Sequence, residues 1–154
     1  MITSKKFIGL CLATFLVAFV GFTAWAASGP EEILNQIIQK YMEQRFGESM
    51  KYIAAADPKV DKVKVDLKKG VLTSRADGSF KLLGKRYKAT YGQTWKDKNN
   101  CAYIADIEFE TEMNATVSDV ARKAMKALYA KKCEPDERLN AAIKAAWLVK
   151  GLTP

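Results

Sequence analysis

Histidine is absent from this chain of 154 residues. Histidine is the commonest catalytic acid or base, so its absence excludes the usual Ser-His-Asp and Cys-His arrangements. The sequence also lacks a Gly-x-Ser-x-Gly elbow and a glycine-rich phosphate loop. Without imidazole, and with only three cysteines, a metal site would depend mainly on carboxylates. We therefore expect no metal, no cofactor and no enzymatic activity.

An apolar run lies near the N-terminus, from Phe7 to Phe22, after the basic residues Lys5 and Lys6. Residues 24–26 read Ala-Trp-Ala and place small side chains at the two positions that a signal peptidase reads. This pattern predicts a signal peptide at residues 1–26 and export to the periplasm or the cell exterior. Residues 7–27 are also long enough to span a bilayer, which leaves a retained membrane anchor as the alternative.

Two cysteines remain after the predicted signal peptide, Cys101 and Cys133. In an oxidising compartment an even pair is most simply explained by one disulfide. The bond would tie the start of the last predicted strand to the junction between two C-terminal helices. Residues 27–154 are therefore expected to form one disulfide-stapled domain.

Helical and strand periodicities follow one another along this domain. Apolar residues recur at helical spacing near residues 31–54, 117–128 and 139–147, and they alternate with polar residues in four segments between residues 62 and 113. The pattern predicts an α+β fold: an N-terminal helix, a four-stranded antiparallel meander and two C-terminal helices packed on one sheet face, in two layers. The order of elements resembles cystatin-like folds in topology alone, since no family motif accompanies it.

Local signals predict the turns of the meander. Asp77-Gly78 is typical of a two-residue hairpin turn, and a change of apolar phase near Leu83-Gly84 predicts a β-bulge there. Residues 96–100 are expected to form a polar loop between the last two strands. We expect Trp95 to face Cys101, a register that also sets Lys88 against Glu108 and Arg86 against Glu110.

Positive charge is concentrated in the middle of the chain. The net charge is +8, and the segment from Lys59 to Lys98 contains 12 basic and 4 acidic residues. A basic surface of this kind can bind an anionic lipid, a polysaccharide or an acidic protein, although a merely solvated strand face has the same pattern. The predicted contact residues on the outer sheet face are Lys62, Lys64, Arg86 and Lys88.

A second predicted contact cluster lies at one end of the sheet and comprises Trp95, Lys96, Lys98 and Tyr103. Aromatic side chains here could stack on a sugar or a base, but they also share the phase of the core. Packing under the helices is therefore the favoured interpretation for Trp95 and Tyr103, and the contact cluster is the alternative.

The acidic residues of the last strand offer one catalytic alternative. Asp106, Glu108, Glu110 and Glu112 share a face, and a pair of carboxylates can hydrolyse glycosides. Such a pair needs one acid held protonated in a sheltered site, whereas these residues are predicted to face basic partners and water.

Taken together, these patterns favour a small exported, non-catalytic binding or accessory protein of the cell envelope. Its expected partner is another exported or envelope protein, with anionic lipid or polysaccharide as alternatives, whereas nucleic acid is not expected. An exported inhibitor or immunity-type protein that blocks an enzyme with residues 96–100 is the second hypothesis, and a carboxylate-based hydrolase is the third.

Overall fold

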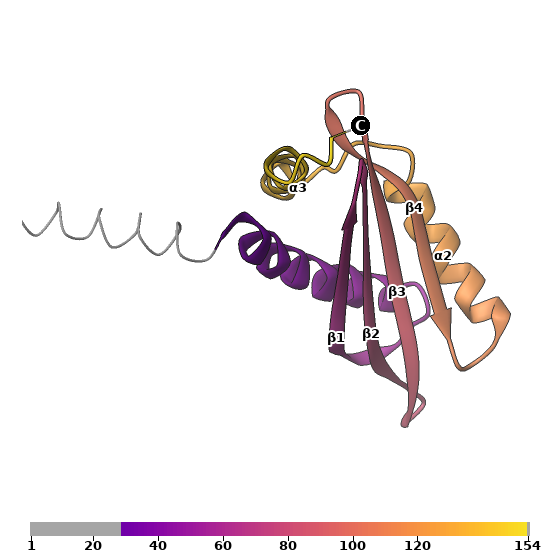
Figure 1. Ribbon diagram of the computed structural model, residues 1–154. Coiled ribbons are helices and arrows are strands. Elements are labelled where there is room, and N and C mark those ends of the chain that lie inside the picture. Colours follow the sequence, from indigo (N-terminus) through magenta and orange to yellow (C-terminus); the bar gives the residue numbers. More distant parts are fainter. Residues whose placement is uncertain (1–28, 154) are drawn as a thin grey trace, which may run out of the picture.

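The computed structural model describes residues 29–153 and shows an α+β fold (Figure 1). Residues 29–51 form the N-terminal helix. Six further elements follow in chain order: β1 (Ala56–Lys68), β2 (Val71–Leu82), β3 (Lys85–Lys98), β4 (Cys101–Thr111), α2 (Ala115–Tyr129) and α3 (Glu137–Val149). The predicted signal peptide lies outside the described residues. None of the helices in the described part of the chain is long and apolar enough to cross a membrane.

The four strands form one antiparallel sheet in the order β1-β2-β3-β4. The N-terminal helix crosses the sheet, α2 runs along β4, and α3 lies near the end of the sheet where β4 begins (Figure 1). Buried side chains from all three helices join those of the strands in a single core. The predicted helix–meander–helix–helix order and the packing of the C-terminal helices on the sheet are therefore confirmed.

The N-terminal helix buries one apolar stripe against the sheet. Leu34, Ile38, Met42, Phe46 and Met50 recur every four residues and are almost completely buried. On the sheet side, β2 and β3 contribute large buried residues at alternate positions, including Leu72, Phe80, Tyr91 and Trp95. This packing leaves the opposite face of the sheet, which we call the outer face, with mainly polar side chains.

The predicted hairpin at Asp77-Gly78 is wrong, because both residues lie inside β2. The turn falls instead at Leu83 and Gly84, where Leu82 pairs with Lys85 and both turn residues have positive φ values, +50° and +78°. The predicted bulge at Leu83-Gly84 is therefore also wrong. The apolar phase changes there because a two-residue turn separates two strands.

Glycine is required at position 78 by the approach of β1 and not by a turn. A Cβ atom at Gly78 would lie 2.2 Å from the carbonyl oxygen of Lys59 and 3.0 Å from the Phe46 ring. This contact lies beside two irregularities in the β1–β2 pairing, between Ala56 and Lys59 and between Val60 and Lys62. A glycine in a strand that admits a neighbouring backbone gives the same sequence signal as a turn glycine.

The predicted register between β3 and β4 is wrong as well. Lys98 pairs with Cys101 across a two-residue turn, where Asn99 and Asn100 adopt φ values of +52° and +58°. Asparagine tolerates this left-handed conformation, so a tight turn replaces the expected five-residue loop. Ala105 has no partner between the Trp95–Ile104 and Thr94–Asp106 pairs, which places a bulge in β4.

The corrected register changes the charge pairs of the outer face. Glu108 lies opposite Gly92, and Glu110 lies opposite Thr90, instead of Lys88 and Arg86. Arg86 forms its ion pair with Asp57, at the start of β1. The backbone N–H of Lys88 donates to the Glu112 carboxylate at 3.1 Å.

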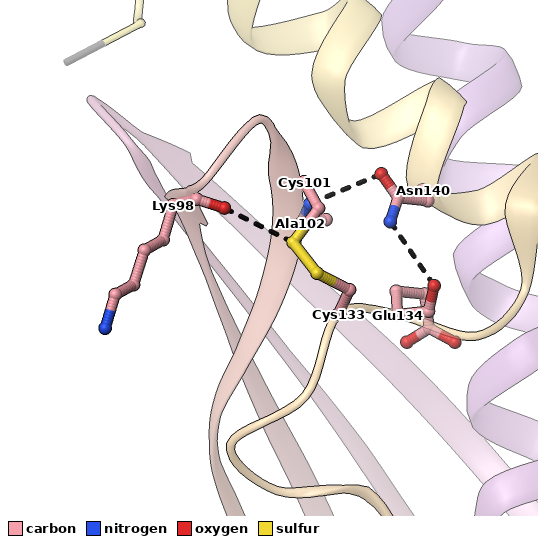
Figure 2. Close-up of a disulfide and its surroundings, with 6 residues drawn as sticks. All are labelled: Lys98, Cys101, Ala102, Cys133, Glu134 and Asn140. Atoms are coloured by element: carbon pink, nitrogen blue, oxygen red, sulfur yellow. Dashed lines mark hydrogen bonds between the residues drawn. A yellow bond between two sulfur atoms is a disulfide. The ribbon is translucent and has the colours of Figure 1, made fainter.

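Cys101 and Cys133 lie at disulfide distance, with the sulfur atoms 2.02 Å apart (Figure 2). The loop containing Cys133 also pairs with the edge of β4: Glu134 N–H donates to the Ala102 carbonyl, and Lys131 N–H donates to the Ile104 carbonyl, each at 2.8 Å. Nearby, Asn140 of α3 accepts from Ala102 N–H and donates to the Glu134 carbonyl (Figure 2). The disulfide and these hydrogen bonds fasten residues 131–134 to the edge of the sheet.

Candidate functional site

The outer face carries the four basic residues of the first predicted contact group. Lys62 and Lys64 lie on β1 and are exposed, and they pair with Asp77 and Arg75 of β2. Arg86 and Lys88 lie on β3, near the β2–β3 turn, and pair with Lys81 and Ser79. The four residues therefore share one face but form two groups, with β2 between them.

The balance of charge on the outer face changes from β1 to β4. Lys62, Lys64 and Arg75 lie on the β1 side with Asp66 and Asp77 among them, and β4 carries Asp106, Glu108 and Glu110. Between them the corresponding β3 positions are Thr90, Gly92 and Thr94. Short side chains thus separate a side of mixed charge from an acidic side, a distribution that suits a partner with charges of both signs.

Local pairs favour the ionised form of two carboxylates of this face, Asp77 and Asp106. The hydrogen bond from Arg75 lowers the pKa of Asp77, and a second one from Thr90 adds to the effect. The Lys126 ammonium, 2.7 Å from Asp106, lowers the pKa of that carboxyl. These arrangements favour an acid that stays charged, which is the reverse of what a glycosidase proton donor needs.

The second predicted cluster is only partly at the surface. Trp95 is completely buried, so its assignment to a contact surface is wrong. Lys96 and Lys98 are exposed, and the Lys98 ammonium lies 4.9 Å from the centroid of the half-buried Tyr103 ring. These three residues remain together at the β3–β4 end of the sheet, where Lys96 pairs with Tyr103.

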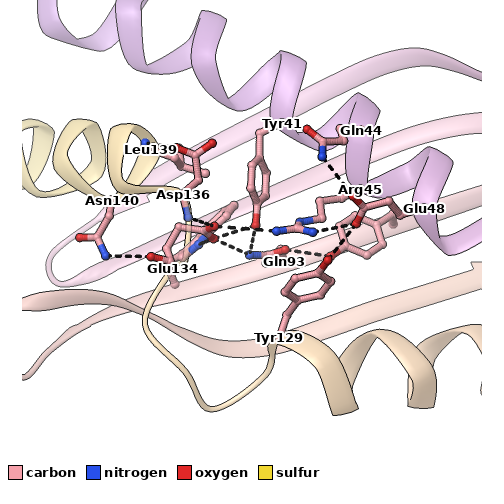
Figure 3. A network of polar contacts seen from close by, with 12 residues as sticks. Tyr41, Gln44, Arg45, Glu48, Gln93, Tyr129, Glu134, Asp136, Leu139 and Asn140 are labelled. Atoms are coloured by element: carbon pink, nitrogen blue, oxygen red, sulfur yellow. Dashed lines mark hydrogen bonds and ion pairs between the residues drawn. The ribbon is translucent and has the colours of Figure 1, made fainter.

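Trp95 belongs to a buried polar network that the sequence analysis did not predict (Figure 3). Its centre is Glu134, only 3% exposed. One carboxylate oxygen of Glu134 accepts hydrogen bonds from Tyr41 Oη at 2.7 Å, Trp95 Nε1 at 2.9 Å and Gln93 Nε2 at 3.3 Å. The other oxygen accepts from Asp136 N–H at 3.2 Å. The network joins the N-terminal helix, β3 and the loop before α3.

Arg45 extends the network toward α2. Its guanidinium carbon lies 3.6 Å from the centroid of the Tyr129 ring and 4.7 Å from that of Tyr41. It donates to Glu48 at 2.7 Å and lies 4.0 Å from Glu134. Tyr129 Oη also donates to Glu48, so two carboxylates and two rings surround one buried cation.

Burial determines the protonation of the network's tyrosines. Burial and the nearby Glu134 carboxylate raise the pKa of Tyr41, and burial raises the pKa of Tyr91. Both phenols therefore stay protonated and act as donors, Tyr41 to Glu134 and Tyr91 to Gln93 at 2.8 Å. Nearly every buried polar group is satisfied internally; among the described residues, Arg45 Nε is the buried side-chain atom that has no partner. This arrangement is that of a structural junction.

One weak signal for the network was present in the sequence. Gln93 lies between Tyr91 and Trp95 in the inward phase of β3, and a polar residue at such a position indicates a buried hydrogen bond. Glu134 gave no signal, because it lies in a loop whose path depends on the disulfide and the β4 edge.

Two cavities lie away from the predicted contact residues. One of about 440 Å³ lies between the start of the N-terminal helix and the end of α3, lined by Pro30, Glu32, Ala146 and Val149 among others. Another of about 260 Å³ includes Lys40, Tyr41 and Arg138 in its wall. Within residues 29–153, no group of three or more cysteine and acidic side chains is placed to hold a metal ion.

Comparisons of the chain with protein-family models, with curated proteins and with solved structures found no match. The likeness to cystatin-like folds therefore remains one of element order.

Proposed function

We propose that this chain is a small exported, non-catalytic binding or accessory protein of the cell envelope. The observation that carries the proposal is the outer face, where Lys62, Lys64 and Lys88 are exposed, while the helices described within residues 29–153 join the core on the opposite side of the sheet. In this part of the chain the outer face therefore presents charged side chains that a partner of complementary charge can contact. Its partners would be an envelope protein, or an anionic lipid or polysaccharide.

Two features support export, the pattern of the N-terminal residues and the cysteine pair. The apolar run at residues 7–22 follows two lysines and precedes small residues at positions 24 and 26. Cys101 and Cys133 lie at disulfide distance, and disulfides persist in oxidising compartments. The test is mass spectrometry of the protein purified from an expressing cell. A chain that begins at Ala27 and has lost two thiol protons supports export, whereas a full-length chain with free thiols in the cytoplasm contradicts it.

The role of the outer face is tested by charge reversal. Lys62→Glu combined with Lys64→Glu should weaken retention of the protein on envelope extract at low salt and leave its circular dichroism unchanged. Lys40→Glu with Lys51→Glu is the matched control, because both lysines are exposed on the N-terminal helix. Equal losses from the two double variants would show that net charge, and not the outer face, governs binding.

The inhibitor hypothesis rests on the hairpin between β3 and β4. The Asn99-Asn100 turn directly precedes Cys101, so the Cys101–Cys133 bond fixes its base. A turn held in this way loses little conformational entropy on entering an enzyme cleft. Replacing Asn99-Asn100 by Gly-Gly should reduce inhibition of a target enzyme, and unchanged inhibition would exclude this hairpin as the blocking element.

A further inference from the structure

The β2–β3 turn projects beyond the ends of β1 and β4 (Figure 1). The turn residues are Leu83 and Gly84. Leu83 is 98% exposed and has a φ value of +50°. Exposed leucines are common, but the left-handed conformation disfavours a branched side chain at this position. The other tight turn of the sheet has the same sign of φ and uses Asn99 and Asn100. Leucine at the apex is thus unfavourable for two independent reasons: its backbone adopts the left-handed conformation, and its apolar side chain is exposed to water.

Cations surround this apex. Lys81 and Arg86 form a cross-strand pair on the outer face, and Lys85 follows the turn on the other face, where its ammonium lies 5.3 Å from the Tyr87 ring centroid. Lys59 and Lys88 lie further back, opposite Ser79. Two acids are close to this group: Asp57, which pairs with Arg86 and Lys81, and Glu112, which accepts from Lys88 N–H. Five cations against two carboxylates leave the end of the hairpin basic.

Buried apolar side chains anchor the β2–β3 hairpin to the core below its turn. Phe80 is completely buried and its ring stacks on that of Tyr87, with centroids 5.8 Å apart. Leu82, next to the apex, is half-buried. The apex is therefore held out on a packed two-stranded arm.

We propose that the β2–β3 turn inserts Leu83 into the surface of an anionic membrane, with Lys81, Lys85, Arg86 and Lys88 binding lipid phosphates. This inference rests on the proposed binding function and gives it a ligand. The order of groups along the hairpin, apolar at the apex and cationic behind it, matches the order of a bilayer, where hydrocarbon lies beneath charged headgroups. A convex tip fits such a surface directly, whereas a protein partner would need a pocket shaped for one leucine.

The test is the binding of the chain starting at Ala27 to vesicles made of equal parts of phosphatidylglycerol and phosphatidylcholine. Residues 29–153 contain a continuous core, so this form retains the fold. Leu83→Asn should lower the vesicle partition coefficient by roughly tenfold, because the variant loses the favourable free energy of transferring a leucine side chain from water into the membrane. The same variant should raise the thermal midpoint, because asparagine suits the left-handed conformation, so loss of folding cannot explain weaker binding.

The cationic component has a matched control on the same strand pair. Lys81→Gln with Lys85→Gln should lower partitioning by roughly tenfold or more. Lys96→Gln with Lys98→Gln removes the same charge near the opposite end of β3 and should change it by less than about twofold. Vesicles of phosphatidylcholine alone should bind weakly.

A Leu83→Trp variant reports insertion directly. Trp95 and Trp147 are completely buried, so they give a constant background, and a blue shift on adding anionic vesicles would come from position 83. Binding that depends on Lys62 and Lys64 but not on Leu83 would overturn the inference and leave the proposed function standing. Absence of vesicle binding, equal retention on soluble polyphosphate, or leucine-dependent binding only to an acidic protein would each overturn it too.

Discussion

Replacing Glu134 by alanine should destabilise the protein more than any other single loss of a carboxylate. The side chain is buried, and three side-chain donors converge on one of its oxygens. After truncation Gln93 can still donate to Tyr41 Oη, which lies 3.2 Å away. The Trp95 indole N–H and the Tyr41 hydroxyl proton lose their acceptor.

The magnitude follows from these stranded groups. A buried donor left without a partner costs about 1–3 kcal/mol, so two of them give about 2–6 kcal/mol. Removing one member of a buried charged group costs about 3–5 kcal/mol, which agrees with this range because Arg45 also loses a nearby anion. We expect a loss of about 4 kcal/mol, a large part of the roughly 5–15 kcal/mol that stabilises a domain.

Urea unfolding followed by tryptophan fluorescence measures this change. Trp95 itself donates to Glu134, and an m value of roughly 2 kcal/mol/M converts the loss into a midpoint lower by about 2 M. Glu110→Ala is the matched control, since it removes a carboxylate from the exposed outer face and should change stability by less than about 0.5 kcal/mol. If Glu134→Ala cost no more stability than Glu110→Ala, the network would not hold the N-terminal helix, β3 and the loop before α3 together, and the reasoning would fail.

Three further predictions concern the backbone, the cysteines and the response to acid. Gly78→Ala should destabilise the fold by about 2–3 kcal/mol in urea unfolding, because its Cβ would meet the Lys59 carbonyl at 2.2 Å, whereas Gly92→Ala, whose nearest contact is 3.4 Å, should change stability by less than about 1 kcal/mol. The Cys101–Cys133 bond joins residues with a sequence separation of 32, so reducing it should lower the free energy of unfolding by about 3–4 kcal/mol on the chain-entropy model. The stability of a Cys101→Ser/Cys133→Ser variant should not respond to reductant. A thermal midpoint of the parent protein that does not change with reductant would contradict the bond. Hydrogen bonds from Arg75 and Lys126 lower the pKa values of Asp77 and Asp106 in the folded state. Both carboxylates therefore stabilise the fold at pH values above their ordinary pKa, at about pH 4. This stabilisation is lost as the pH falls through the lowered pKa values of the folded state. Asp77→Asn with Asp106→Asn should therefore flatten the fall in stability measured by urea unfolding between about pH 4 and about pH 2, and an unchanged slope would refute the pairing.

Local patterns in the sequence were sufficient for the fold class. Apolar residues alternate with polar ones on β1, and this alternation indicates which face of the strand packs on the core. The four-residue spacing from Leu34 to Met50 indicates the buried side of the N-terminal helix in the same way. The Cys101–Cys133 pairing was also accessible, because only two cysteines follow the predicted leader. These inferences depend on residues close in sequence or on simple counting.

Turn positions and registers required the tertiary structure. Asp77-Gly78 has the composition of a turn, yet Gly78 is needed because the backbone of β1 passes against it. Leu83 adopts a conformation that leucine disfavours, so no propensity rule would place the turn there. The tight turn at Asn99-Asn100 shifts the β3–β4 pairing from the predicted register, and the β4 bulge at Ala105 shifts it by one residue more, so Glu108 and Glu110 lie opposite Gly92 and Thr90.

The sequence by itself determined the order of helices and strands, the single candidate cysteine pair and the basic character of the middle segment, since each depends on local periodicity or composition. The tertiary structure decided that Trp95 is buried, that Glu134 gathers donors from the N-terminal helix and β3, and that the leucine of the β2–β3 turn stands exposed among cations. The physical reason is that burial and hydrogen bonding of these groups depend on elements far apart in the chain, whose contacts are fixed only when the sheet and helices pack together.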